Sequence, residues 1–428
     1  MIVASAKWLR QMLLFSIYGL GVLGIVGSGG GGGSSGDCEG FNATVDCADY
    51  STIQPITLPE GGGAEGFDGT VNSIAPALDG SDDVYVGGDF TIYKNSSANR
   101  IARLNNDSSL DTSFITGTGF NGAVRIVTPA TDGSGDVYVG GSFTNYNGAA
   151  VNGIARLNLD GSLDTNFITG TGFNGKVEII TPAIVGIGDV YVGGDFTNYN
   201  GTVVGNGLVR LDDDGLLDVG FNTGSGWGTE SIAPVDDGSG DVYVSRDTSP
   251  GIARLNSDGT IDPGFDTGAS GFNDAVLVIT IATDGSDDVY SAGSFDDYNG
   301  TETRGLVRLN NDGTIDTGFA TGDSNIHSIS IATLAIDGSG DIYYGPLAFG
   351  AIARLDSNGI RDPGFDTLTD PFFGGFGGPF GEIGYLPINV ALANDGSGDV
   401  YVVGSFTRYN LTPTARIARL TSGGGFVW

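Results

Sequence analysis

The sequence is short of the residues on which much protein chemistry depends. Its 428 residues include two cysteines, one histidine and only three lysines, at Lys7, Lys94 and Lys176. A single histidine, His327, excludes metal sites built from several histidines and leaves little material for histidine-based catalysis. Basic residues number 18 against 51 acidic ones. The clustered Lys and Arg that neutralise phosphates are therefore missing, and nucleic acid is excluded as a partner.

Several motifs and patterns are missing as well. There is no G-x-S-x-G, no P-loop and no C-x-x-C, which are signatures of serine hydrolases, phosphate-binding loops and redox or metal sites. No stretch after Gly29 has a sustained helical period, and no Gly-X-Y period accompanies the 76 glycines. With 39% hydrophobic and 10% aromatic residues, the chain has enough apolar surface for a folded core, which argues against disorder.

The N-terminal segment, 1–28, is typical of a secretory signal peptide. Lys7 and Arg10 precede an apolar run of about 15 residues, which is short for a spanning helix of roughly 20. An uncleaved N-terminal membrane anchor is the alternative. Residues 29–50 are expected to form a Gly/Ser linker. Ser28 stands where a bacterial lipoprotein would carry its lipidated cysteine, so a lipid anchor is not expected.

Cys38 and Cys47 enclose eight residues. In an exported chain they are expected to form a local disulfide. No neighbouring histidine points to either cysteine as a nucleophile. The chain is therefore predicted to be secreted or held at the cell surface.

One unit of sequence occurs seven times. A motif Asp-Val/Ile-Tyr begins at Asp83, Asp136, Asp189, Asp241, Asp288, Asp341 and Asp399. Each copy is followed by Ile-Ala-Arg-Leu or Leu-Val-Arg-Leu, and six of the seven end in Asp-x-x-Phe. The copies lie about 53 residues apart, and a repeat of this length indicates a propeller or a solenoid.

Within each unit the apolar pattern is that of short strands. Residues 124–143 form two β-rich runs around a polar turn, and residues 153–167 form a strand, an Asp-Gly turn and a short strand. We name these strands A to D. Seven such units predict an all-β, seven-bladed β-propeller over residues 51–428, with a parallel β-helix as the alternative. Late in strand A stand prolines that fit an unpaired innermost strand: Pro76, Pro129, Pro182 and Pro234.

The runs GSLDTNF, VYVGGSF and GIARLN resemble the delta-60 repeat family of bacterial β-propellers, found in secreted and surface proteins. The resemblance covers about residues 67–420. It implies the propeller fold and no particular reaction or ligand. Units four and six are short, and unit seven ends without Asp-x-x-Phe. Either Thr52–Leu58 or Phe426–Trp428 is therefore expected to supply the last strand that closes the ring.

The acidic residues fall mainly in two kinds of turn. The A–B turns, such as residues 79–83, hold 16 aspartates, and the C–D turns, such as residues 105–111, hold about 14 more. In an antiparallel meander these two turns lie at the same end of a blade. Most of the net charge of −33 is therefore expected on one face. The B–C and D–A connections, rich in Tyr, Asn, Thr and Gly, are expected on the opposite face.

The acidic turns have two interpretations. Asp132, Ser134 and Asp136 alternate as the oxygen ligands of calcium loops do, and Asp160 and Asp164 of the neighbouring C–D turn are candidates to complete the shell. In the other interpretation, which we prefer, Asp, Gly and Ser serve the turns themselves and keep the chain soluble. The bidentate glutamate of a full calcium loop is missing. Calcium is the one cofactor that the sequence points to.

An arginine recurs once in every unit. It is expected to pair with an aspartate inside its own blade, with Asp111 and Asp164 as partners across the C–D hairpin. Such a pair would set the register of that hairpin, which is a structural role. The seven arginines are Arg103, Arg156, Arg210, Arg254, Arg308, Arg354 and Arg419.

A tyrosine recurs in only five units, at the end of an F-x-x-Y run. Because units four and six lack it, a purely structural role is not expected, and these loops are the candidate ligand-binding sites for a sugar or a protein surface. Packing of each tyrosine over its own hairpin is the alternative. The five residues are Tyr93, Tyr146, Tyr199, Tyr298 and Tyr409.

The predicted function is that of a secreted or cell-surface binding or structural module without catalytic activity, whose partner is a protein or a glycan. The alternatives are a calcium-dependent carbohydrate-binding adhesin and a carboxylate-dependent glycosidase or lyase. The acids here fall in repeated turns, whereas a catalytic pair should be unique. His327 is expected to be a structural strand residue. The aromatic insert at 371–385 is a further candidate contact, and a membrane contact is expected only through an uncleaved N-terminal segment.

Overall fold

The computed structural model describes residues 66–428, except residues 187, 206, 225–228, 246–248, 320–328, 336–337, 346–350, 368–375, 378–386 and 411. The chain divides into two units, Met1–Leu58 and Pro59–Trp428, and every described residue belongs to the second. Several predicted features lie outside the described residues: the signal peptide (1–28), the linker (29–50), the disulfide Cys38–Cys47, the segment Thr52–Leu58, His327 and most of the insert 371–385.

The described residues form strands joined by turns. None of them belongs to a helix with the length and hydropathy that a membrane crossing needs. Each repeat contributes an antiparallel sheet whose strands lie in the order A-B-C. The A strands are β1 (Val71–Pro76), β6 (Val124–Pro129), β11 (Lys176–Pro182), β16 (Ile232–Pro234), β19 (Val276–Ile281), β24 (Ile331–Leu334) and β29 (Pro387–Leu392).

The B strands carry the Val-Tyr motif and lie in the middle of each sheet. They are β2 (Val84–Gly88), β7 (Val137–Gly141), β12 (Val190–Asp195), β17 (Val242–Ser245), β20 (Val289–Gly293), β25 (Ile342–Gly345) and β30 (Val400–Gly404). The C strands carry the repeated arginine. They are β5 (Ile101–Leu104), β10 (Ile154–Leu157), β15 (Leu208–Leu211), β18 (Ile252–Leu255), β23 (Leu306–Leu309), β26 (Ala353–Leu355) and β33 (Ile417–Leu420).

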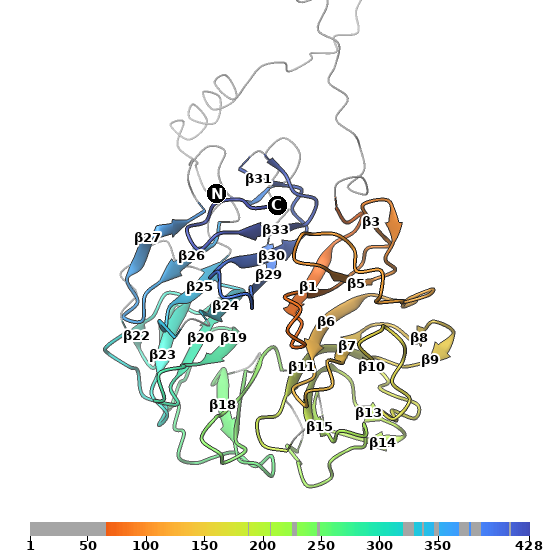
Figure 1. Cartoon of the computed structure of the whole chain (residues 1–428). Coiled ribbons are helices and arrows are strands. Elements are labelled where there is room, and N and C mark those ends of the chain that lie inside the picture. Colours follow the sequence, from red (N-terminus) through yellow and green to blue (C-terminus); the bar gives the residue numbers. More distant parts are fainter. Residues whose placement is uncertain are drawn as a thin grey trace, which may run out of the picture. The chain divides into compact units, whose positions relative to one another are not determined.

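The sheets stand around a ring with their A strands innermost (Figure 1). Each A strand contacts the A strand of the next unit, from β1 through β6, β11, β16, β19 and β24 to β29, which contacts β1 again. The described residues form seven such sheets. Pro76 ends β1 opposite Val84, at an edge where its missing N–H removes no ladder bond. The all-β propeller fold predicted from the repeats is confirmed.

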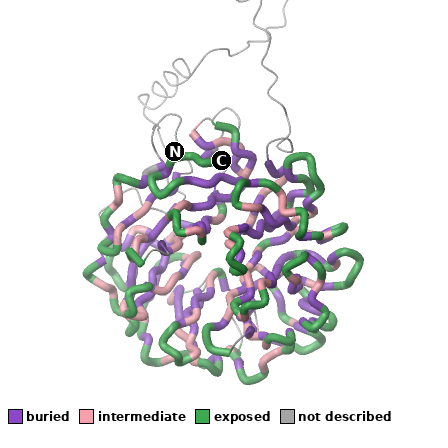
Figure 2. The backbone as a smooth tube through the Cα atoms, in the orientation of Figure 1, coloured by how far each residue is buried: buried purple, intermediate pink, exposed green. Residues whose placement is uncertain are grey.

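The core lies between neighbouring sheets rather than within one. In one cluster Tyr85 and Ile101 of the first unit pack with Val124 and Val137 of the second. Figure 2 shows buried residues along the strands and exposed residues in the turns and at the periphery. Because each cluster needs two units, a single repeat cannot bury its apolar surface alone.

Glycine in the B strands lets adjacent sheets approach closely. A Cβ atom at Gly140 would lie 2.6 Å from Ile126 Cγ2 and 2.7 Å from Val177 Cγ1. Both distances are shorter than van der Waals contact allows. Part of the high glycine content therefore serves packing between blades as well as turns.

Five units carry an additional two-stranded hairpin between strands B and C, at the periphery of the ring (Figure 1). Its two-residue turn has positive φ at both positions, 47° at Asn147 and 88° at Gly148, as a type I′ turn requires. The hairpins are β3 (Ile92–Tyr93) with β4 (Ser96–Ser97), β8 (Asn145–Tyr146) with β9 (Ala149–Ala150), β13 (Asn198–Tyr199) with β14 (Thr202–Val203), β21 (Asp297–Tyr298) with β22 (Thr301–Glu302), and β31 (Arg408–Tyr409) with β32 (Thr412–Pro413). In the seventh unit β28 (Phe376–Gly377) adds a third strand beside β31.

Strand D is short in most units. A single bridge joins it to strand C, for example Leu157 to Leu163, whereas the sixth unit has a longer fourth strand, β27 (Arg361–Asp366). In the seventh unit Trp428 accepts at its carbonyl from the amide of Arg419 at 2.9 Å. Of the two segments expected to supply the last strand, Phe426–Trp428 therefore does so.

Candidate functional site

The A–B turn is held by its own side chains. In the first unit Asp79 Oδ1 accepts hydrogen bonds from the amide of Ser81 at 3.1 Å and from its hydroxyl at 2.6 Å. Ser81 Oγ in turn accepts from the amide of Asp83 at 3.2 Å. Short polar side chains that bond the main chain two residues on are what a tight turn of this kind needs.

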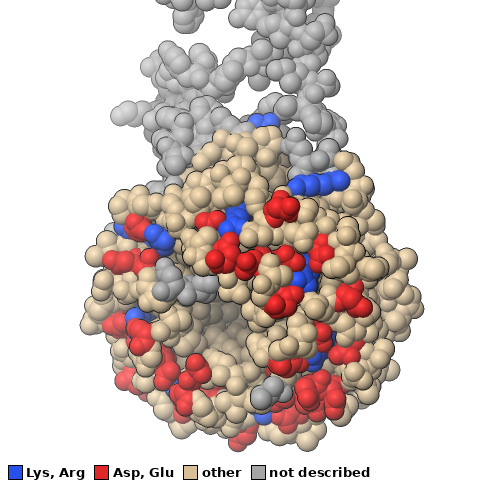
Figure 3. Space-filling model, viewed as in Figure 1, with Lys and Arg blue, Asp and Glu red and all other residues tan. Residues whose placement is uncertain are grey.

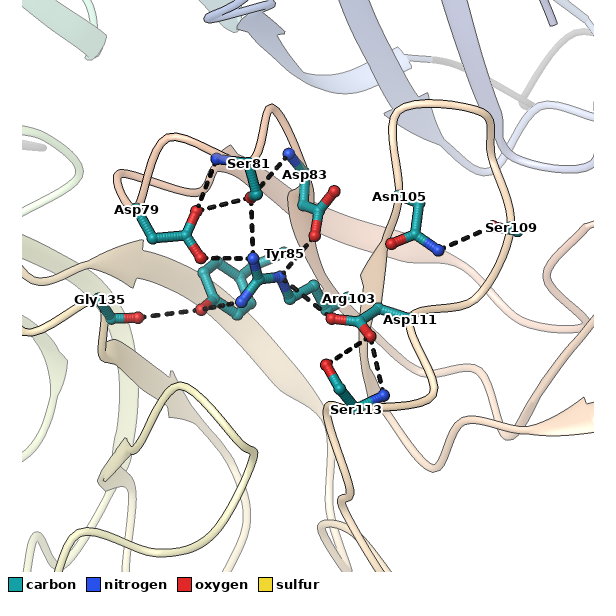
Figure 4. A network of polar contacts seen from close by, with 10 residues as sticks. All are labelled: Asp79, Ser81, Asp83, Tyr85, Arg103, Asn105, Ser109, Asp111, Ser113 and Gly135. Carbon is teal, nitrogen blue, oxygen red and sulfur yellow. Dashed lines mark hydrogen bonds and ion pairs between the residues drawn. The ribbon is translucent and has the colours of Figure 1, made fainter.

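Arg103 connects this turn to the C–D turn (Figure 4). The pairing of β2 with β5 sets Arg103 opposite Tyr85, so the guanidinium reaches the end of the sheet. Its Nη2 lies 2.5 Å from Asp79 Oδ2, and its Nε lies 3.0 Å from Asp83 Oδ2 and 3.4 Å from Asp111 Oδ2. The side chain is 5% exposed. One guanidinium thus holds three carboxylates of one blade together.

The same arrangement recurs around the ring. Arg156 pairs with Asp132 at 2.5 Å, with Asp136 at 3.0 Å and with Asp164 at 3.5 Å. The predicted pairing inside each blade is confirmed, but the aspartates of the A–B turn, rather than Asp111 and Asp164, are the nearer partners. The remaining arginine–aspartate pairs are Arg254 with Asp237, Asp241 and Asp262, Arg308 with Asp284, Asp288 and Asp316, Arg419 with Asp395 and Asp399, Arg210 with Asp218, and Arg354 with Asp341 and Asp362.

In units one, two, four, five and six these pairs confirm that the A–B and C–D turns meet at one end of the blade. We call this end of the ring the acidic end. Figure 3 shows the acidic residues gathered around a central hollow, with basic residues visible only in small patches among them.

A tyrosine extends the hydrogen-bond network of Arg103 to the next unit. Arg103 Nη1 donates to the hydroxyl of Tyr85 at 3.5 Å, and that hydroxyl donates to the carbonyl of Gly135 in the second unit at 3.1 Å. Burial raises the pKa of Tyr85 to about 12, so its hydroxyl stays protonated and remains a donor. The contact links adjacent blades.

The two aspartates of one turn have opposite pKa shifts. Burial opposes the ionisation of Asp79, but hydrogen bonds from Ser81 and Arg103 outweigh it and hold the pKa of Asp79 below its usual value. Burial raises the pKa of Asp83, because Arg103 compensates for it only in part. The second unit repeats this split at Asp132 and Asp136.

In the second unit most of the residues proposed as calcium ligands contact an arginine. Arg156 occupies the position between Asp132 and Asp136 where the ion was expected, and its Nη2 also donates to Ser134 Oγ at 3.1 Å. Asp160 instead accepts from the amide and the hydroxyl of Ser162 within its own turn. In the part of the chain that the structure describes, no group of three or more His, Cys, Asp and Glu residues is placed to hold a metal ion.

The five candidate tyrosines are not surface residues, which corrects the prediction that their rings contact a ligand. Each is at most 2% exposed. Tyr146 packs against Phe120 and Phe143 of its own unit, with the Tyr146 and Phe120 ring centroids 4.5 Å apart. The hydroxyls donate to main-chain carbonyls of the C–D turns, in the pairs Tyr93–Ser108, Tyr146–Gly161, Tyr199–Gly215, Tyr298–Gly313 and Tyr409–Gly424. The hairpins therefore lie beside the C–D turns at the periphery, and not apart from them on an opposite face.

The loss of this tyrosine from two units has a structural reason. The tyrosine belongs to a module of a hairpin and two phenylalanines, which also appears as Phe67, Phe90 and Tyr93. Units four and six lack a hairpin between the described parts of their B and C strands. A purely structural tyrosine is lost when its whole module is lost, so its absence from two units was no sign of binding.

The outward side of the hairpins differs from unit to unit. The residue before each tyrosine is Ile92, Asn145, Asn198, Asp297 or Arg408, and the second strands read Ser-Ser, Ala-Ala, Thr-Val, Thr-Glu and Thr-Pro. All five second strands are exposed. Beside β8 and β9 lies a hollow of about 300 Å³, between Ala150, Ile154 and the segment from Leu163 to Gly170. We call the five hairpins and this hollow the hairpin rim.

Sequence reasoning missed two sets of residues at these sites. The first is the leading aspartate of the A–B turn, which precedes its arginine by the same number of positions in units one, two, five and seven. That constant spacing was a usable signal. The second is the phenylalanine that precedes the tyrosine at a constant spacing, as Phe67 precedes Tyr93 and Phe120 precedes Tyr146.

A family model described as "Domain of unknown function (DUF5122) beta-propeller" matches residues 81–114, 133–167, 188–221, 237–265, 289–319 and 396–425. Each matched segment runs through the B and C strands of one unit. Six segments of the chain match this β-propeller repeat family. The predicted resemblance to the delta-60 repeat family is thereby confirmed. The sixth unit is not among the matched segments of the family.

Solved structures are similar to this chain at low sequence identity. The WD40 β-propeller domain of Doa1 is 15% identical, with 83% of this chain and 94% of that chain covered and a TM-score of 0.54. Virginiamycin B lyase from Staphylococcus aureus is 17% identical, with 82% and 95% covered and a TM-score of 0.48. A streptogramin B lyase is 16% identical, with 82% and 92% covered and a TM-score of 0.48. Among curated proteins no relative matches the chain.

Proposed function

We propose that the chain is a non-catalytic binding module, secreted or held at the cell surface, and that it contacts a protein partner through the hairpin rim. The observation that carries this proposal is the contrast between the two sides of each hairpin. The inward side repeats one tyrosine, two phenylalanines and one hydroxyl–carbonyl bond. The exposed second strand has a different sequence in each of the five hairpins.

Variation on a constant scaffold is typical of surfaces that bind macromolecules. The residues before the tyrosines include an exposed apolar side chain at Ile92 and half-buried amide, acidic and basic side chains at Asn145, Asp297 and Arg408. Five identical small ligands would need five similar sites. A single protein surface lying across several hairpins needs a different side chain at each contact, which favours a protein over a repeated sugar.

The hollow of the second unit supports the same location. It combines apolar side chains, Ile154 and Ile168, with polar ones at Thr165 and Asp164. Apolar surface with a few polar groups is the usual composition of a contact pocket. Export is supported by the N-terminal pattern of the sequence and by the excess of acidic residues, 51 against 18, which keeps a protein soluble.

The proposal is tested by probing an array of purified cell-surface proteins and a glycan array with the labelled full chain. The variants Ala149→Glu/Ala150→Glu and Thr202→Glu/Val203→Glu place charge on two hairpins without touching the buried tyrosines. They are expected to weaken binding on the protein array by about tenfold or more. Leu78→Glu, an equally apolar-to-acidic change at an exposed site in the A–B turn of the first unit, is the control and is expected to leave binding unchanged.

Two outcomes would overturn the proposal. One is binding on the protein array that all three variants leave unchanged. The other is binding on the glycan array alone.

A further inference from the structure

The A–B turn of the third unit departs from the repeat. The second unit carries Thr131 and Asp132 at the positions where the third unit carries Ile184 and Val185. Ile184 is 50% exposed and Val185 is 47% exposed. Two branched apolar side chains are thus exposed to water at the acidic end. The first unit also has an exposed apolar residue at the position of Ile184, namely Leu78, but Val185 stands where every other unit carries an aspartate.

This change also removes an ion pair. Val185 occupies the position from which Asp132 reaches Arg156 at 2.5 Å. In the third unit Arg210 pairs with Asp218 of the C–D turn, at 2.5 Å from Nη2. The third unit therefore lacks a buried charge contact that its neighbour has, and exposes apolar surface in its place. Neither change serves the stability of the turn itself.

Carboxylates flank the apolar turn on both sides. The backbone of Gly188, in the same turn, is so close to Asp213 that a Cβ atom on it would lie 2.6 Å from Asp213 Cβ. On the other side a Cβ atom at Gly240, in the A–B turn of the fourth unit, would lie 3.8 Å from Val185 Cβ. That neighbouring turn carries the exposed Asp236, next to Asp237, which pairs with Arg254 at 2.8 Å.

The third unit also has the longest run of acids in any C–D turn. Asp212, Asp213 and Asp214 are consecutive, and the last two are exposed. Their charges act on Asp189, at the end of the A–B turn of the same unit. Burial raises the pKa of Asp189, and the negative charges of Asp212 and Asp213 raise it further. Carboxylates therefore outnumber basic groups around the apolar turn, where Arg210 also acts on Asp189.

We propose that this turn is a docking site for a basic, amphipathic segment of a partner protein. We call it the apolar turn patch and define it as Ile184 and Val185 with Asp213, Asp214 and Asp236. An apolar side chain of the partner would cover Ile184 and Val185, and flanking Lys or Arg residues would meet the carboxylates. Apolar contact supplies the affinity of such an interface, and complementary charge supplies the orientation and the association rate. The patch lies at the acidic end and does not depend on the hairpin rim.

The test uses the full chain and a synthetic amphipathic peptide built from Leu and Lys, with a twin in which Glu replaces every Lys. The variant Ile184→Thr/Val185→Asp gives the third unit the residues of the second. It removes the apolar contact and adds a carboxylate. If the apolar turn anchors the partner, the variant binds the Leu/Lys peptide about tenfold more weakly. If charge alone drives the contact, the variant binds as tightly or more tightly, which would overturn the proposal.

Four controls keep the result interpretable. Leu78→Ser removes an exposed apolar side chain from the A–B turn of the first unit and is expected to leave peptide binding unchanged; equal loss in both variants would also overturn the proposal. The melting temperature of Ile184→Thr/Val185→Asp is expected to equal or exceed that of the wild type, because Asp at position 185 meets Arg210.

The Glu twin is expected not to bind, and binding of both peptides would overturn the proposal, because the carboxylates would then play no part. The hairpin variants Ala149→Glu/Ala150→Glu are expected to bind the Leu/Lys peptide normally, so this test fails or succeeds separately from the proposed function.

Discussion

Tyr146 donates a hydrogen bond from its hydroxyl to the carbonyl oxygen of Gly161 at 2.5 Å, joining hairpin β8–β9 to the C–D turn of the same unit. Four other units repeat this bond. It places a residue that sequence reasoning took for a ligand contact inside the molecule. The tyrosine holds the hairpin, and the hairpin presents the variable residues.

Removing this hydroxyl is expected to destabilise the fold. In Tyr146→Phe the carbonyl of Gly161 loses its buried partner, which costs about 1–2 kcal/mol of unfolding free energy. Tyr146→Ala also empties the space beside Phe120 and Phe143, and costs about 3–5 kcal/mol. Urea unfolding measures both. Ala149→Ser, on the exposed strand of the same hairpin, is the control and should change little. If Tyr146→Ala were as stable as the wild type, the structural role of Tyr146 in its hairpin and phenylalanine module would be contradicted.

The repeated arginine should matter more in the second unit than in the third. Arg156→Met leaves the half-buried Asp132 and the buried Asp136 without their cation, and loss of one partner from such a cluster costs about 3–5 kcal/mol. Arg210→Met is expected to cost less, because Val185 replaces the leading aspartate and Asp218 is more exposed, at 27%. The measurement is again urea unfolding. A larger loss for Arg210→Met than for Arg156→Met would contradict this account.

Acid should weaken the fold through Asp395. Burial opposes its ionisation, yet hydrogen bonds from Ser397 and Arg419 lower its pKa from 3.8 to about 2. Between these values the unfolded chain binds a proton that the folded chain does not. The contribution of Asp395 to the unfolding free energy is therefore fully present above pH 3.8. It is lost as the pH falls toward about 2. Asp395→Asn is expected to show a flatter loss of unfolding free energy over that range than the wild type.

Asp83 should behave in the opposite sense. Burial raises the pKa of Asp83 above its usual value of 3.8. Its contribution to the unfolding free energy is therefore present below pH 3.8 and is lost as the pH rises through the pKa of the folded state. At neutral pH Asp83→Asn is therefore expected to cost less unfolding free energy than Asp79→Asn, whose parent pKa is lowered. The reverse order in a denaturation series at pH 7 would show that Arg103 does not distinguish the two carboxylates.

Close packing between blades predicts a cost for enlarging Gly140. Its Cβ would meet Ile126 and Val177, and overpacking of this kind costs about 1–3 kcal/mol. Gly140→Ala should therefore lower the urea midpoint. Gly423→Ala, where the nearest atom is 3.6 Å away, is the matched control. Equal midpoints for the two variants would mean that the sheets can separate without cost.

Calcium should not alter the stability of the second unit. The carboxylates of Asp132 and Asp136 already meet Arg156, and an ion there would have to displace a guanidinium that is hydrogen-bonded at several atoms. Melting curves with millimolar calcium and with chelator are expected to coincide. A rise in the melting temperature that Asp132→Asn abolishes would restore the calcium hypothesis.

The sequence was sufficient for everything that depends on period and local chemistry. Seven copies of one unit, with alternating apolar residues and Asp-Gly turns, determine short antiparallel strands and place the A–B and C–D turns at one end. Once the turns meet, Arg103 and its six counterparts have acidic partners within the blade. These are consequences of strand geometry, which is the same in every β-sheet.

The tertiary structure alone decided which side of each feature faces water. Alternation along β8 shows that Asn145 and Tyr146 point to opposite sides, but not which side Phe120 covers, because Phe120 lies on a different segment. For the same reason the tyrosines were misassigned to the surface. Ile184 and Val185 differ from the repeat in sequence, yet only their exposure, and the nearness of Asp213 and the fourth unit's turn, make them a candidate contact. Burial depends on what packs from elsewhere in the chain, and a period of about 53 residues carries no record of it.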